Sequence, residues 1–144
     1  MWIHFIKEID SELGFNEPAT MESIQIVEQQ LKAIIPQSLR SLLLETDGVH
    51  HSEFYYDIFW PVERILKENQ NIRNEDDVEY YDSFDHLLFF SDAGNGDLFA
   101  FLVSNGKVES DEVIVWKHEN DSRERISSSL EEFVKGWLEG TIGV

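Results

Sequence analysis

The loop from Asp92 to Asp97, with the sequence DAGNGD, contains residue types that can hold phosphate or calcium. A phosphate-binding loop of the Gly-Lys-Ser/Thr kind needs a lysine after its last glycine, and none follows Gly96. An EF-hand loop that began at Asp92 would need an oxygen ligand at Gly94 and a glutamate at Val103. The spacing therefore supports neither site, and it favours a strand-connecting turn with residues at positive φ.

Histidine and serine are the other residue types here that could catalyse a reaction. The five histidines lack the spacing of a metal-ligand set, and they are His4, His50, His51, His86 and His118. One of them could form an acid–base couple with Asp47, Glu53 or Asp92, but no nucleophile accompanies it at motif spacing. The run from Ser127 to Ser129 lacks a Gly-x-Ser-x-Gly elbow and fits helix capping better. We therefore predict no catalytic residue, no cofactor and no metal.

An acidic segment surrounds two tyrosines in the middle of the chain. Between Asn74 and Asp85 it holds six acidic residues and no Lys or Arg. One interpretation is a solvated charged loop. The other is a protein-binding patch, in which carboxylates pair with a partner's Lys or Arg and tyrosines supply contact area. Trp60, at the end of a predicted strand, could lie in the core or line a groove. The candidate binding residues are Glu75, Asp76, Asp77, Glu79, Tyr80, Tyr81, Asp82 and Trp60.

The net charge limits the possible partners. Twenty-nine Asp and Glu against eleven Lys and Arg give a formal charge of −18, which repels nucleic acids and anionic membranes and attracts basic proteins. The absence of cysteine agrees with a reducing compartment, and the N-terminal residues lack the pattern of a signal peptide. We therefore expect a cytoplasmic protein with a basic protein partner.

Hydrophobic periodicity predicts helices in the N-terminal third of the chain. Apolar residues at helical spacing favour a helix from Trp2 to Leu13, followed by a glycine that would cap it. A second helix is expected to begin near Thr20 and a third at Pro36, the latter ending at Gly48.

The rest of the chain favours strands and two further helices. A period of two predicts a strand from Phe54 to Trp60, and Pro61 is expected to begin a helix that fades near Arg73. Three apolar runs, 87–90, 98–103 and 113–116, predict an antiparallel meander. After a polar loop that contains Arg123 and Arg125, the capping-box spacing at Ser128 and Ser129 predicts a last helix. This order predicts a single α+β domain over residues 1–144, with a mainly antiparallel sheet, N-terminal helices and a C-terminal helix packed against the sheet.

Several motifs follow one another in an order that resembles a known family. They are Ile35-Pro36 with three leucines before Asp47-Gly48, Phe59-Trp60-Pro61 before Val62-Glu63-Arg64-Ile65, Gly94-Asn95-Gly96-Asp97 before a strand, and Val115-Trp116-Lys117-His118-Glu119 before Ser129-Leu130-Glu131-Glu132-Phe133. Together they resemble the SUKH superfamily, which includes the yeast cell-wall-assembly regulator and many bacterial immunity proteins. The resemblance covers about Thr20 to Gly140.

The resemblance implies an α+β domain without enzymatic activity. It also implies an intracellular antidote that binds and neutralises a cognate secreted polymorphic toxin, often a nuclease. We expect it to act by occluding the active site of that toxin. The family's usual Trp-Asp-His is Trp116-Lys117-His118 here, so a lysine replaces the aspartate. Two alternatives remain at this stage: a regulatory scaffold, and a hydrolase built on His50 or His118 with nearby acids.

Overall fold

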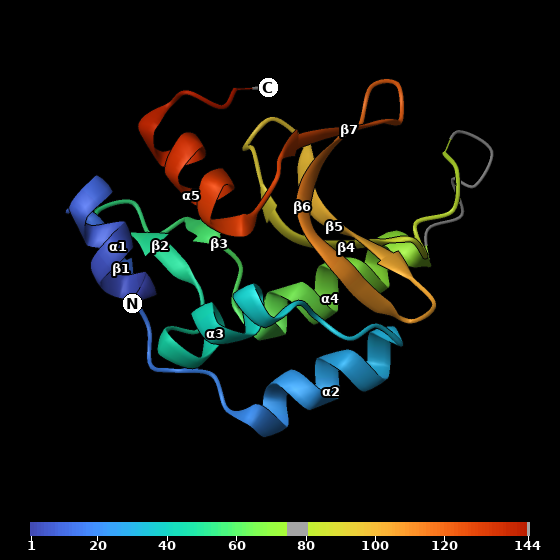
Figure 1. The fold of residues 1–144 in the computed structure, drawn as a ribbon, viewed down its shortest axis with the longest axis horizontal. Coiled ribbons are helices and arrows are strands. Elements are labelled where there is room, and N and C mark those ends of the chain that lie inside the picture. Colours follow the sequence, from blue (N-terminus) through green and yellow to red (C-terminus); the bar gives the residue numbers. More distant parts are fainter. Residues whose placement is uncertain (75–80, 144) are drawn as a thin grey trace.

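The computed structural model in Figure 1 describes residues 1–74 and 81–143. Within these residues, five helices and seven strands follow one another in the predicted α+β order. The helices are α1 (Trp2–Ile9), α2 (Met21–Leu31), α3 (Gln37–Glu45), α4 (Val62–Arg73) and α5 (Leu130–Glu139). The strands are β1 (Leu13–Phe15), β2 (Val49–His51), β3 (Asp57–Phe59), β4 (Leu87–Asp92), β5 (Leu98–Ser104), β6 (Lys107–Lys117) and β7 (Ser122–Ser127).

The strands form two antiparallel sheets, with the orders β1-β2-β3 and β4-β5-β6-β7. The sheets meet where the chain after β3 passes beside β4, because the Trp60 N–H donates to the Phe90 carbonyl at 3.1 Å. Ser91 Oγ also donates to the Ile58 carbonyl at 2.6 Å. The two sheets are therefore linked by hydrogen bonds as well as by side-chain packing.

Helices α4 and α5 cover the larger sheet (Figure 1). Aromatic rings are a large part of the core between these layers. Phe133 of α5 packs against Phe99 of β5, with their ring centroids 4.6 Å apart. A second group of rings contains Phe84, Phe89 and Trp116, and the Phe84 and Trp116 centroids are 5.3 Å apart. Burial of aromatic rings supplies much of the apolar area that stabilises a domain of this size.

The predicted helix starts from Thr20 onwards are confirmed, and side-chain capping contacts mark the starts of α2 and α5. Thr20 Oγ1 accepts the Ser23 N–H at 3.0 Å, and the Ser23 hydroxyl accepts the Thr20 N–H in return. Helix α4 begins after Pro61, as expected, and α5 begins after Ser129, whose hydroxyl accepts the Glu132 N–H. Each contact satisfies a backbone donor that has no partner within the helix.

The first helix is shorter than the sequence predicts. It ends at Ile9, and Asp10 takes an extended conformation while its carboxylate accepts the Glu12 N–H. Leu13 to Phe15 then form strand β1, which pairs with β2. The prediction was wrong because a three-residue strand has no period of its own, and its conformation is set by the neighbouring strand.

Two further strand predictions need correction. The predicted strand from Phe54 to Trp60 is reduced to Asp57–Phe59, and residues 52–56 form the connection of a hairpin between β2 and β3. The polar loop around Arg123 and Arg125 is instead strand β7, which pairs with β6 and is an edge strand of the sheet that the described residues form. Its polar composition misled the prediction, because edge strands carry charged residues on their exposed side.

Candidate protein-binding site

Three connecting segments meet beside one end of the larger sheet: the β4–β5 turn, the β6–β7 turn and the residues from Tyr81 to Asp85 that lead to β4. We call this region the turn surface, and define it by Tyr81, Asp82, Asp97, His118 and Asp121. Two depressions open on either side of His118. One, of about 290 Å³, is lined by Asn95, Asp97, Lys117, His118, Glu119 and Asn120. The other, of about 370 Å³, is lined by Glu68, Asn71, Ile72, Tyr81, Gly96, Leu98, Trp116 and His118.

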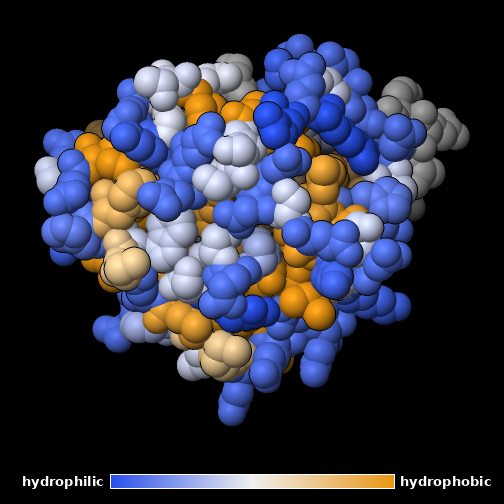
Figure 2. Space-filling view, in the orientation of Figure 1, coloured by the Kyte–Doolittle hydropathy of each residue, from blue (hydrophilic) through white to orange (hydrophobic). Residues whose placement is uncertain are grey.

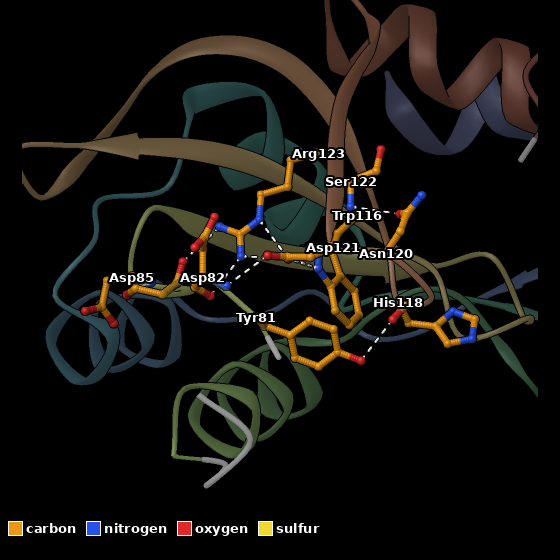
Figure 3. Close-up of polar contacts among 10 residues, drawn as sticks. Tyr81, Asp82, Asp85, Trp116, His118, Asn120, Asp121, Ser122 and Arg123 are labelled. Carbon is orange, nitrogen blue, oxygen red and sulfur yellow. Dashed lines mark hydrogen bonds and ion pairs between the residues drawn. The ribbon is translucent and has the colours of Figure 1, made fainter. Parts of the chain in front are cut away.

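Asp121 is the centre of a hydrogen-bond network that holds the turn surface together (Figure 3). One carboxylate oxygen accepts the Trp116 indole N–H at 2.7 Å and the Arg123 guanidinium at 2.9 Å. The other accepts the Asp82 backbone N–H at 2.8 Å. Arg123 then donates to the carbonyls of Ser83 and Asp82. The segment that leads to β4 is therefore fixed to the β6–β7 turn.

Tyr81 is half-buried and packs against the sheet. Its ring centroid lies 5.2 Å from that of Trp116, and the two rings meet edge to face. Its hydroxyl donates to the His118 carbonyl at 2.9 Å, a contact that Figure 3 shows. This ring therefore supports the β6–β7 turn, and only its remaining edge is available to a partner.

His118 and Asp97 form a charge-assisted pair between the two turns. The His118 Nδ1 atom lies 2.8 Å from an Asp97 carboxylate oxygen, which also accepts the His118 backbone N–H. Among the described residues, no hydroxyl side chain hydrogen-bonds to either side chain of this pair. Within the described residues, no three Asp, Glu or His side chains lie close enough together to hold a metal ion. The pair therefore joins the β4–β5 turn to the β6–β7 turn. The sequence pattern did not predict this contact.

The carboxyls of Asp97 and Asp121 both titrate below their ordinary pKa of 3.8. Burial raises the pKa of each carboxyl, but hydrogen bonds lower it by more. For Asp97, these hydrogen bonds come from His118. For Asp121, they come from the Asp82 N–H, the Trp116 indole and Arg123. Lys117 lowers the pKa of Asp97 further through its positive charge.

These pKa shifts predict acid sensitivity. A carboxyl whose folded pKa lies below its unfolded pKa contributes stability above the unfolded value and loses it as the pH falls through the folded value. We expect the free energy of unfolding, measured in urea, to fall from about pH 5 downwards. The double variant Asp97→Asn/Asp121→Asn is expected to show a shallower slope over that range. An unchanged slope would contradict the assignment.

A comparison with protein families identifies the chain. The model of the SMI1 / KNR4 family (SUKH-1) matches residues 18–136, which is most of the chain. The protein belongs to the SMI1 / KNR4 family. No curated protein was found to match it. None of the helices in the described part of the chain is long and apolar enough to span a membrane.

Only part of the predicted binding patch of this SUKH-1 member can be placed. Glu75, Asp76, Asp77, Glu79 and Tyr80 lie outside the described residues. Tyr81 and Asp82 lie on the turn surface, and the Asp82 side chain is exposed.

Trp60 does not have the position of a contact residue. Its ring is 1% exposed, its indole N–H donates to Asp92 at 2.8 Å, and the Arg64 guanidinium lies over it. The core alternative therefore describes Trp60, because its side chain is buried and already contacts Asp92 and Arg64.

Sequence reasoning missed Asp97, Asp121 and Arg123 as members of the site. The Asn120-Asp121 pair after a predicted strand does signal a turn. The partners of Asp121 at Asp82 and of His118 at Asp97 are 39 and 21 positions away, so no local pattern could reveal them. In this SUKH-1 chain, Lys117 adds positive charge beside Asp97.

Proposed function

We propose that this protein is an immunity protein that binds a cognate secreted toxin, a nuclease, and occludes its active site or substrate channel. The observation that carries the proposal is a formal charge of −18 on a member of the SMI1 / KNR4 family. A nuclease presents a cationic surface to its substrate phosphates, and a strongly anionic protein can occupy that surface. The protein acts as one domain in the cytoplasm of the cell that makes the toxin.

Electrostatic attraction explains how such a complex would form quickly. A field of this sign raises the association rate with a basic protein, and the effect weakens as salt rises. Affinity then depends on apolar anchors that are desolvated in the complex. On the face drawn in Figure 2, hydrophobic residues form separate patches among hydrophilic ones, so contact there would combine both kinds of group.

Binding, and not catalysis, is the role we assign to the turn surface. Its histidine is already used to join two turns, and its carboxylates accept hydrogen bonds from the protein's own backbone, indole and guanidinium groups. The Asp82 side chain is exposed on this surface, and further acidic residues precede Tyr80 in the sequence. We propose that Asp82 and the acidic residues before Tyr80 attract the cationic toxin during the encounter, as substrate phosphates would.

Co-expression with the toxin gene expected beside its own gene tests this function. We expect the wild-type protein to rescue growth and to purify with the toxin as a one-to-one complex. Failure of both would reject the immunity role, and the regulatory-scaffold alternative would then be favoured.

Charge reversal tests the acidic segment separately. The variant Asp76→Lys/Asp77→Lys is expected to lower the association rate at low salt by about tenfold, because rim charges act mainly on association. The matched control is Glu17→Lys/Glu22→Lys, which makes the same change in net charge at two exposed residues elsewhere. Equal rates for the two variants would show that total charge matters and that the segment itself does not.

A further inference from the structure

The hairpin connection between β2 and β3 presents three consecutive aromatic side chains to solvent. Phe54 is 68% exposed, Tyr55 78% and Tyr56 54%. We call these three residues the aromatic tip. The other exposed large hydrophobic residues of the described chain are not consecutive in the sequence. Exposed apolar groups that gather in one place on a folded domain mark interaction sites, and three consecutive exposed aromatic residues are such a group.

The aromatic tip is held in a defined conformation. The Tyr55 N–H donates to the His51 carbonyl at 2.8 Å, and the His51 N–H donates to the Tyr56 carbonyl at 2.9 Å. The His51 ring accepts the N–H groups of Glu53 and Phe54 at Nδ1, and it stacks on the rings of Phe54 and Tyr56. A pre-organised aromatic patch loses little entropy when it binds.

The backbone conformation of Tyr55 indicates that its side chain does not serve to stabilise the fold. Tyr55 has a φ of 57°, in the left-handed region that a bulky residue rarely adopts and that glycine adopts freely. A highly exposed ring at such a position costs stability where glycine would not. Strain of this kind is a pointer to function.

A glycine in the neighbouring strand supports the ring next to Tyr55. His50 stacks on Tyr55 with centroids 6.1 Å apart, and it pairs across the sheet with Gly14. A Cβ atom on Gly14 would lie 2.4 Å from the His50 Nε2 atom, so the imidazole packs directly on the Gly14 backbone. The tip thus rests on a second layer of side chains.

Carboxylates stand at the edge of the aromatic tip. Glu12 lies beside it, since Ser52 donates its backbone N–H to the Glu12 carbonyl at 3.2 Å. The Glu12 side chain is 77% exposed and reaches to 4.0 Å from the His51 Nε2 atom. Glu53 is also exposed within the connection. An apolar centre with an acidic edge is complementary to an apolar pocket surrounded by Lys and Arg.

We propose that the aromatic tip is the anchor through which this protein binds its cationic toxin. The proposal rests on the proposed function and assigns the desolvated anchor to the tip, while the acidic segment acts on the rate of encounter. A second copy of the chain is the less suitable occupant, because two molecules of charge −18 repel each other. Figure 1 places β2 and β3 beside α1, on the other side of the molecule from the β6–β7 turn, so variants can separate the two surfaces.

Binding of the purified toxin encoded by the adjoining gene, followed by interferometry together with thermal melts, tests the anchor. We expect Tyr55→Gly to raise the melting temperature by about 2 °C, because it relieves the left-handed strain. The same variant should weaken binding at least tenfold, mainly through faster dissociation. Phe54→Ser should weaken binding to a similar extent. The control Ile26→Ser, at a side chain that is 51% exposed on α2, should bind as the wild type does.

Each outcome decides the proposal. Gain of stability with loss of binding in Tyr55→Gly supports it. Wild-type affinity in both tip variants overturns the anchor and leaves the immunity role standing. A wild-type protein that does not bind the toxin would overturn both the anchor and the immunity role. Concentration-dependent dimers that disappear in Tyr55→Gly would show that the tip binds a second copy, and would also overturn the proposal.

Discussion

Replacing Asn69 by leucine is expected to lower the free energy of unfolding by about 4 kcal/mol, because it leaves buried backbone groups without partners. Asn69 is fully buried on α4. Its amide oxygen accepts the Phe89 N–H at 2.9 Å, and its amide nitrogen donates to the Phe89 carbonyl at 2.8 Å. The side chain thus takes the place that a further strand would take beside β4.

Urea denaturation measures the loss, and amide exchange locates it. The Phe89 amide should lose protection more than amides in β6, because its acceptor is removed. Asn71→Leu is the matched control, since it makes the same change at an exposed position of the same helix and should cost under about 0.5 kcal/mol. Equal effects of the two substitutions would contradict the role assigned to Asn69.

Replacing Asp121 by alanine is expected to cost about 3 kcal/mol, since it removes the acceptor of a backbone, an indole and a guanidinium donor together. The Asp121 and Arg123 side chains are only 13% and 20% exposed, so water replaces the lost contacts poorly. We expect the Asp82 amide, which donates to Asp121, to exchange much faster in this variant.

Asp82→Ala provides the control for that experiment. It keeps the backbone N–H and carbonyl that enter the network and removes only an exposed carboxylate. Its stability should therefore stay within about 0.5 kcal/mol of the wild type. If Asp121→Ala destabilises the protein no more than Asp82→Ala does, the network contributes little to holding the turn surface.

The sequence by itself determined the parts of the fold that depend on neighbouring residues. The starts of α2, α4 and α5 follow from Thr20, Pro61 and Ser129. The turn before Asp97 has φ of 84° at Gly94 and 101° at Gly96, as expected for a strand-connecting turn. Capping, proline geometry and glycine freedom act within a few residues, so the pattern alone reveals them.

Only the tertiary structure decided which residues meet. Strands β1 and β2 have three residues each and exist because each pairs with a neighbour. The Asp121 network, the His118–Asp97 pair and the burial of Trp60 all join segments that lie far apart in the chain. The exposure of Phe54 to Tyr56 likewise depends on where the hairpin ends. A period of two cannot tell a strand from a turn, because long-range hydrogen bonds and packing make that choice.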